Sequence, residues 1–108
     1  MKKIVMLRKK EEFSHLFRYG KRVETPLFTL FIKQNNVGFL RLGVVVSKSV
    51  DKRAVIRNTL RRRIKEWVRK LTPPPIHAKD IVFLLKKEVV IAPRKKIYEE
   101  LNAIKEKI

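Results

Sequence analysis

The chain has 108 residues, 44% of them hydrophobic, and 28 Lys and Arg against 10 Asp and Glu give it a formal net charge of +18 at pH 7. This length suits one domain, which we expect over residues 1–108, and the absence of cysteine excludes disulfides, cysteine-based zinc sites and thiol nucleophiles. No apolar run approaches the about 20 residues that span a bilayer, so we expect a cytoplasmic protein whose positive charge serves a polyanionic partner.

The first half of the chain predicts a short helix and three strands, over residues 10–19, 21–25, 27–33 and 39–47. Phe13, Leu16 and Phe17 recur at helical spacing, and Gly20 stands where a helix stop is expected. Turn-forming residues at 34–36 separate the second strand from the third. We expect the strands to form a meander.

The second half predicts a long helix, a buried strand and a last helix, over residues 51–71, 80–86 and from 93 onward. Asp51 is placed to cap the long helix, and Thr72–Pro75 cannot continue it, so this segment is expected to be an extended connector. Pro93 opens the last helix, where apolar residues recur at helical spacing: Ile97, Leu101, Ile104 and Ile108. The order αβββαβα predicts an α+β sandwich with helices packed on a mixed four-stranded sheet.

The long helix has two faces of opposite character. On a helical wheel, one arc holds the apolar side chains expected to face the core: Ile56, Leu60, Ile64, Trp67, Val68 and Leu71. The adjoining arc is polar and strongly basic: Arg57, Asn58, Arg61, Arg62, Lys65 and Arg69. Only Glu66 interrupts this second arc, from its far edge.

Cations of the basic arc repeat four residues apart, and each such like-charged pair destabilises a helix by a few tenths of a kcal/mol. This cost is explained if phosphate groups neutralise the row in use. Arginine offers a bidentate fork to phosphate or guanine, and Asn58 adds a donor and an acceptor. The pattern predicts nucleic-acid binding without separating RNA from DNA; a solvated basic face with no ligand is the alternative.

The segment RNTLRRRIKE, from Arg57 to Glu66, resembles the R-N-x-x-K-R-x-x-R-E signature of the bacterial ribonuclease P protein subunit. Arg61 stands where Lys is usual and Lys65 where Arg is usual; both keep the charge, but Lys65 lacks the planar fork. Upstream, RLGVVVSK at 41–48 is similar to a strand of that family, and FSHLFRYG at 13–20 to its F-x-x-x-F-x-x-G first helix.

The resemblance implies a left-handed crossover from the third strand through the basic helix to the fourth strand. It also implies a protein that binds the catalytic RNA of ribonuclease P and the single-stranded 5′ leader of precursor tRNA. Mg²⁺ is then required by the holoenzyme and held mainly by RNA, with no metal site on the protein and no obligate protein partner. The residues expected to contact the catalytic RNA are Lys48, Lys52, Arg53, Arg57, Asn58, Arg61, Arg62, Lys65 and Arg69.

Aromatic residues predict where a single strand would stack. Phe31 shares its strand face with Thr29 and Lys33, which suits a base platform better than a core position. By resemblance, the leader-binding cleft is lined by Phe13, Phe17, Phe31, Lys21 and Arg22. Ordinary core packing is the alternative for Phe13 and Phe17, and Gly43 within a strand suggests close approach of a ligand or another backbone.

An autonomous nuclease would need clustered carboxylates for metal ions or a histidine pair for acid and base work. The acids are scattered, and His15 and His77 are interpreted as surface residues of a helix and a connector. We therefore expect no catalytic residue on the polypeptide, which is an enzyme only as the subunit of an RNA-based endoribonuclease. A general RNA-binding or ribosome-associated protein, and an autonomous metal nuclease, are the alternatives.

Overall fold

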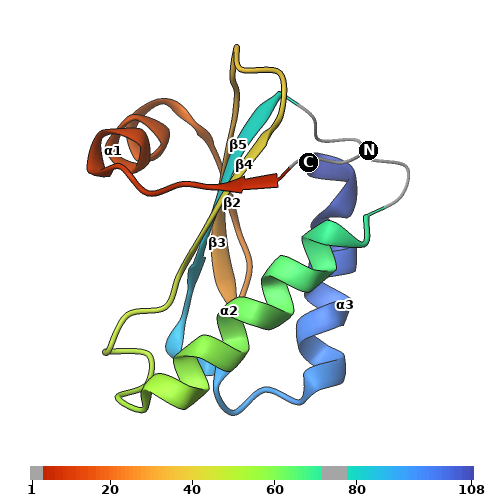
Figure 1. Ribbon diagram of the computed structural model, residues 1–108. Helices are drawn as coiled ribbons and strands as arrows, with labels where there is room; N and C mark the ends of the chain where they lie inside the picture. Colours follow the sequence, from red (N-terminus) through yellow and green to blue (C-terminus); the bar gives the residue numbers. More distant parts are fainter. Residues whose placement is uncertain (1–3, 72–77) are drawn as a thin grey trace.

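A five-stranded mixed sheet with helices on both faces organises the chain, in a computed structural model that describes residues 4–71 and 78–108 (Figure 1). The strands are β1 (Ile4–Met6), β2 (Lys21–Glu24), β3 (Phe28–Gln34), β4 (Leu40–Val45) and β5 (Lys79–Leu85). The helices are α1 (Lys10–Tyr19), α2 (Ala54–Arg69) and α3 (Arg94–Ile104), with short 3-10 turns η1 (Lys87–Val89) and η2 (Lys105–Lys107). The predicted α+β class and order of major elements are confirmed.

The strand order β1-β4-β5-β3-β2 corrects two expectations. The sheet has five strands because Ile4–Met6 pairs in parallel with β4 at one edge. The predicted meander is wrong beyond the β2–β3 hairpin, because β5 inserts between β3 and β4, antiparallel to the first and parallel to the second. Parallel neighbours need a long connection, and α2 supplies it between β4 and β5.

The two faces of the sheet have separate cores. Phe28, Leu30 and Ile32 lie on the face that packs against α2 and α3, as the alternation along β3 predicts. Phe31 points to the other face, where it packs with Leu16 of α1. In Figure 1, α1 accordingly lies on one side of the sheet and α2 and α3 on the other.

The helix faces are as predicted, but one boundary is not. The apolar residues expected to face the core from α2 and α3 are buried or half-buried in that core. The N-cap of α2 is Arg53, not Asp51. The Asp51 carboxylate accepts hydrogen bonds from the backbone and side chain of Arg53 instead, so the helix begins at Ala54. The connector Thr72–Pro75 and His77 lie outside the described residues.

Arg41 connects α1 to the sheet through three ionic hydrogen bonds. Its Nε and Nη2 donate to the two carboxylate oxygens of Asp80 at 2.8 Å each, and its Nη1 donates to Glu12 Oε2 at 2.7 Å. The Asn35 amide also donates to Asp80. Burial by itself raises the pKa of Asp80, but the hydrogen bonds and positive charges around it outweigh this effect and lower the pKa. The network fixes the start of α1 over β4 and β5.

Candidate nucleic-acid interface

Three phenylalanines from α1 and β3, Phe13, Phe17 and Phe31, form an aromatic cluster on the sheet face that α1 covers. The ring centroids of Phe17 and Phe31 are 5.1 Å apart, and those of Phe13 and Phe17 are 6.3 Å apart. Phe31 is 7% exposed, whereas Phe17 is 41% exposed. Phe31 is therefore a core residue, which corrects the expectation of a base platform at that position. Phe17, which packs against Phe31, is the member whose ring is exposed.

The close approach predicted at Gly43 is made by Phe13. A Cβ on residue 43 would lie 2.7 Å from Phe13 Cε1 and 3.1 Å from Val82 Cγ2. The neighbour of Gly43 is thus a side chain of the aromatic cluster, rather than the ligand or backbone that the sequence suggested. This packing explains why Phe13 is half-buried while Phe17, one turn later, is not.

The two cations predicted beside the aromatic rings lie on opposite faces of β2. Arg22 pairs with Phe31 across the hairpin, and its Cζ lies 5.9 Å from the Phe31 ring centroid. Lys21 pairs with Ile32, so by register it lies on the face that α2 and α3 cover. The structure therefore brings Arg22, but not Lys21, to the aromatic cluster.

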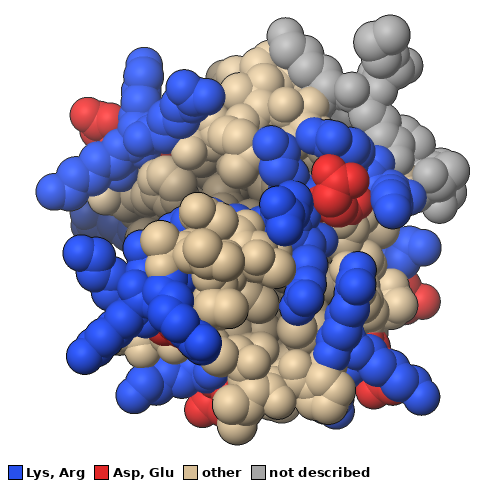
Figure 2. Space-filling view, turned by 60° about the horizontal axis from the view of Figure 1, so that its bottom comes forward, with Lys and Arg blue, Asp and Glu red and all other residues tan. Residues whose placement is uncertain are grey.

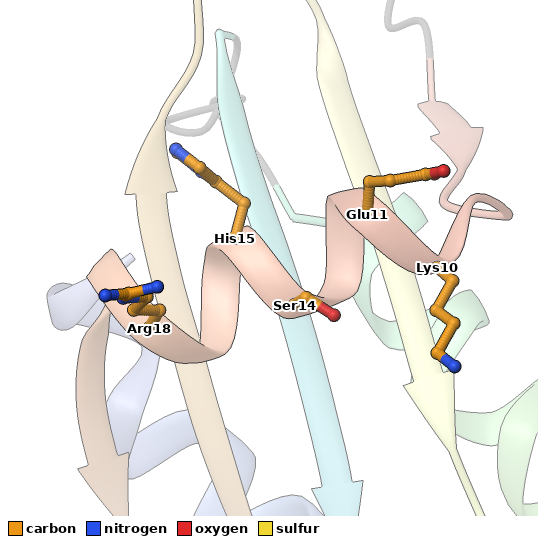
Figure 3. Close-up of a pocket in the computed structure, with 5 residues that line it drawn as sticks. All are labelled: Lys10, Glu11, Ser14, His15 and Arg18. Carbon is orange, nitrogen blue, oxygen red and sulfur yellow. The ribbon is translucent and has the colours of Figure 1, made fainter.

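The outer face of α1 carries a shallow pocket whose side chains diverge. It is lined by Lys10, Glu11, Ser14, His15 and Arg18. Figure 3 shows Glu11 and His15 on one side of the helix and Lys10 on the other. The His15 ring contacts that of Tyr19 at 4.9 Å. Within residues 4–71 and 78–108, no three His, Asp or Glu side chains come together as a metal site would need.

The polar arc of α2 forms a continuous basic ridge, made of Arg57, Asn58, Arg61, Arg62, Lys65 and Arg69. Arg57 Nη1 donates to the backbone oxygens of Asp51 at 3.0 Å and Lys52 at 2.8 Å. Arg61 donates to Asn58 Oδ1 at 2.8 Å and to the Val46 oxygen at 3.2 Å. The acceptors of both arginines are neutral oxygens, so these hydrogen bonds supply no counter-charge.

Carboxylates are scarce along the basic ridge. Arg69 pairs with Glu66 within the helix at 3.2 Å, and Arg53 pairs with Asp51 just before it. In the part of the chain that the structure describes, no carboxylate lies within ion-pair distance of Arg57, Arg61, Arg62 or Lys65. Figure 2, which brings the lower end of Figure 1 forward, shows many Lys and Arg side chains on the face in view and only a few, separate Asp and Glu side chains. The first turn of α2 also contains no acid.

Arg41 is the polar residue whose role the sequence did not reveal. It lies half-buried in β4, between apolar neighbours. An isolated charge within an otherwise apolar strand signals a buried ion pair, but Glu12 and Asp80 are too far away in sequence for spacing to reveal them as its partners.

None of the helices in the described ranges is both long and apolar enough to cross a membrane.

The family model described as Ribonuclease P matches residues 1–108. The chain belongs to the ribonuclease P protein family. The ribonuclease P protein component of Aromatoleum aromaticum is 36% identical over 95 residues, covering 88% of this chain and 79% of that protein. The corresponding protein of Thermoanaerobacter sp. strain X514 is 35% identical over 91 residues, covering 84% and 78%.

Solved structures of ribonuclease P proteins share the fold. The protein from Thermotoga maritima superimposes with a TM-score of 0.82 at 25% identity, covering 95% of this chain and 96% of that one. The protein from Staphylococcus aureus gives a TM-score of 0.83 at 27% identity, covering 96% and 94%. Family membership implies a subunit of ribonuclease P, a tRNA-processing ribonucleoprotein, with the ribonuclease P RNA as its partner.

Proposed function

We propose that the chain binds the catalytic RNA of ribonuclease P through the basic ridge and holds the single-stranded 5′ leader of precursor tRNA against the aromatic cluster. The RNA, with Mg²⁺, carries out the hydrolysis. The observation that carries the proposal is that four ridge cations, Arg57, Arg61, Arg62 and Lys65, have no carboxylate within ion-pair distance among the described residues.

Charge repulsion supports the assignment of the ridge to RNA. Arg57, Arg61 and Lys65 follow one another at i, i+4 spacing, which opposes helix formation by a few tenths of a kcal/mol per pair. A folded RNA presents closely spaced phosphates that would neutralise such a row and release counterions. Asn58 is exposed beside Arg61; its Oδ1 accepts from Arg61, and its amide NH2 group is the donor that it offers to a phosphate oxygen.

Ring exposure supports the assignment of the leader. Stacking of one base on an aromatic side chain contributes about 1–3 kcal/mol and tolerates any sequence. Phe17 is 41% exposed and its ring packs against that of Phe31 at 5.1 Å, so a base that stacks on it would meet a ring already in contact with the core. Arg22, whose Cζ lies 5.9 Å from the Phe31 ring centroid, would contact a phosphate of the same strand, in competition with its ion pair to Glu24 at 3.0 Å.

Reconstitution of leader cleavage tests the proposal. A bacterial ribonuclease P RNA is incubated with precursor tRNA at limiting Mg²⁺, with and without the protein. We expect the protein to restore cleavage, because neutralised phosphates reduce the magnesium that the RNA needs. A general RNA-binding protein would bind without restoring cleavage, and an autonomous nuclease would cut with no catalytic RNA present.

A second measurement isolates the contribution of the leader. The holoenzyme should bind precursor tRNA more tightly than mature tRNA, since only the precursor reaches the aromatic cluster. Equal affinities for the two RNAs would overturn the leader assignment while leaving the assignment of the ridge intact.

A further inference from the structure

A basic pocket lies where two segments far apart in the sequence meet, next to the start of α2. Its lining comes from the β4–α2 loop and from η1: Lys48, Ser49, Val50, Asp51, Lys52, Arg53 and Lys87. In Figure 1 both segments lie at the lower end of the molecule. Four of the seven lining residues are cations, one of them contributed by an element that carries no predicted RNA contact.

The single acid of the pocket is already occupied. Asp51 accepts from the backbone N of Arg53 at 2.8 Å and from its Nη2 at 2.8 Å and Nε at 3.0 Å. These hydrogen bonds, the side-chain ones first, lower the pKa of Asp51 to about 2. The carboxylate is therefore ionised and committed to Arg53, and it does not neutralise the lysines of the pocket.

Three lysines remain without a counter-charge. Lys48, Lys52 and Lys87 are exposed, and no described carboxylate lies within ion-pair distance of their ammonium groups. The neighbouring Lys86 differs, because its Nζ donates to the Thr25 oxygen at 2.7 Å and lies 3.5 Å from Glu24 Oε1. Lys86 is thus used within the fold, whereas Lys87 contributes only unbalanced charge to the pocket.

The pocket is physically joined to the basic ridge. Arg57 Nη1 donates to the backbone oxygens of Asp51 and Lys52, so the first ridge residue holds the loop that lines the pocket. We propose that the pocket binds a backbone phosphate of the ribonuclease P RNA, with Lys87 of η1 as a contact outside α2. The RNA then follows the ridge and continues past the start of α2. This inference rests on the proposed function of the ridge.

Salt-dependent binding tests the inference. The affinity for a bacterial ribonuclease P RNA is measured over a series of salt concentrations for the wild type, Lys87→Ala, Lys87→Arg and Lys95→Ala. Lys95 is the matched control, an exposed lysine in the first turn of α3 that does not line the pocket. Each protein is first checked for an unchanged unfolding midpoint, as expected for exposed positions.

We expect Lys87→Ala to reduce the slope of log affinity against log salt by about 0.7–0.9, the effect of one phosphate contact. This corresponds to about 5- to 8-fold weaker binding at 0.1 M salt. Lys87→Arg should restore the slope, and Lys95→Ala should leave it unchanged. Equal effects of Lys87→Ala and Lys95→Ala would show that only net charge matters, and the proposal that the pocket binds a phosphate would be wrong.

The experiment distinguishes failure of the pocket proposal from failure of the proposed function of the ridge. If the wild type binds the RNA and Arg62→Ala reduces the slope but Lys87→Ala does not, the pocket inference alone is overturned. If Arg62→Ala also leaves the slope unchanged, the proposed function of the ridge fails with it.

Discussion

The ring of Phe13 occupies the space that a side chain on Gly43 would take, since a Cβ there would lie 2.7 Å from Phe13 Cε1. We therefore expect Gly43→Ala to push Phe13 out of the aromatic cluster. The overpacking should lower the free energy of unfolding by about 1–3 kcal/mol. It should also reduce the preference of the holoenzyme for precursor over mature tRNA, measured by equilibrium binding.

Gly38→Ala is the matched control for this change. Gly38 has φ +80°, and no atom lies within 4 Å of the position that a Cβ would take, so alanine there is strained but displaces nothing. We expect a loss of about 1–2 kcal/mol in stability and an unchanged preference for the precursor. If both glycine variants reduce the preference alike, lost stability rather than the position of Phe13 is the cause.

Removing the exposed ring should affect binding more than folding. Because Phe17 is 41% exposed, we expect Phe17→Ala to weaken binding of precursor tRNA about 5- to 140-fold, which corresponds to the contribution of one stacked base. Binding of mature tRNA should be unchanged. Tyr19→Ala removes a ring that is 60% exposed and contacts His15, and it should change the binding of neither precursor nor mature tRNA. A lowered melting temperature with normal leader preference would support core packing for Phe17.

Stability and RNA binding should trade off on the basic ridge. Lys65→Glu replaces like-charged pairs with Arg61 and Arg69 by opposite-charged pairs at the same spacing. We expect the free protein to gain about 1 kcal/mol in urea unfolding and to lose affinity for the catalytic RNA. Lys65→Gln only removes the repulsion, so its stability to urea and its RNA affinity should both lie between those of the wild type and Lys65→Glu. A Lys65→Glu protein that binds RNA normally would argue for a solvated face.

The network around Arg41 predicts a component of acid sensitivity. The pKa of Asp80 in the folded state is below its ordinary value of 3.8, because hydrogen bonds from Arg41 and Asn35 outweigh the effect of burial. Its contribution to stability is therefore complete above about pH 4 and is lost as the pH falls through the folded pKa. Asp80→Asn should cost about 1–3 kcal/mol at pH 7 and flatten urea-unfolding stability against pH below about 4. An unchanged pH profile would show that the network is not coupled to folding.

Local patterns predicted the elements well and their pairing poorly. The alternation of Phe28, Leu30 and Ile32 and the apolar arc of α2 follow directly from period, so the faces of β3 and α2 were predicted. Strand order depends on contacts between distant segments, which is why the insertion of β5 beside β4 was missed. Ile4–Met6 is too short to show a period, and it is a strand only because β4 has a free edge.

The candidate interface shows the same division. The ridge could be predicted because one helix carries all of it, and helical spacing determines its neighbours. The contribution of Lys87 could not be predicted, because only the tertiary fold brings η1 to the β4–α2 loop. Asp51 was expected to be the N-cap because of its residue type. Its carboxylate instead accepts hydrogen bonds from the backbone N, Nε and Nη2 of Arg53, and Arg53 is the N-cap.

The central claim is that the basic ridge contacts RNA phosphates. Its most direct test is the affinity for ribonuclease P RNA over a salt series for the wild type, Arg62→Ala and Lys105→Ala. Arg62 is exposed and has no described carboxylate partner, while Lys105 is an exposed lysine of η2. We predict a slope reduced by about 0.9 for Arg62→Ala only. Identical slopes for all three proteins would contradict the claim.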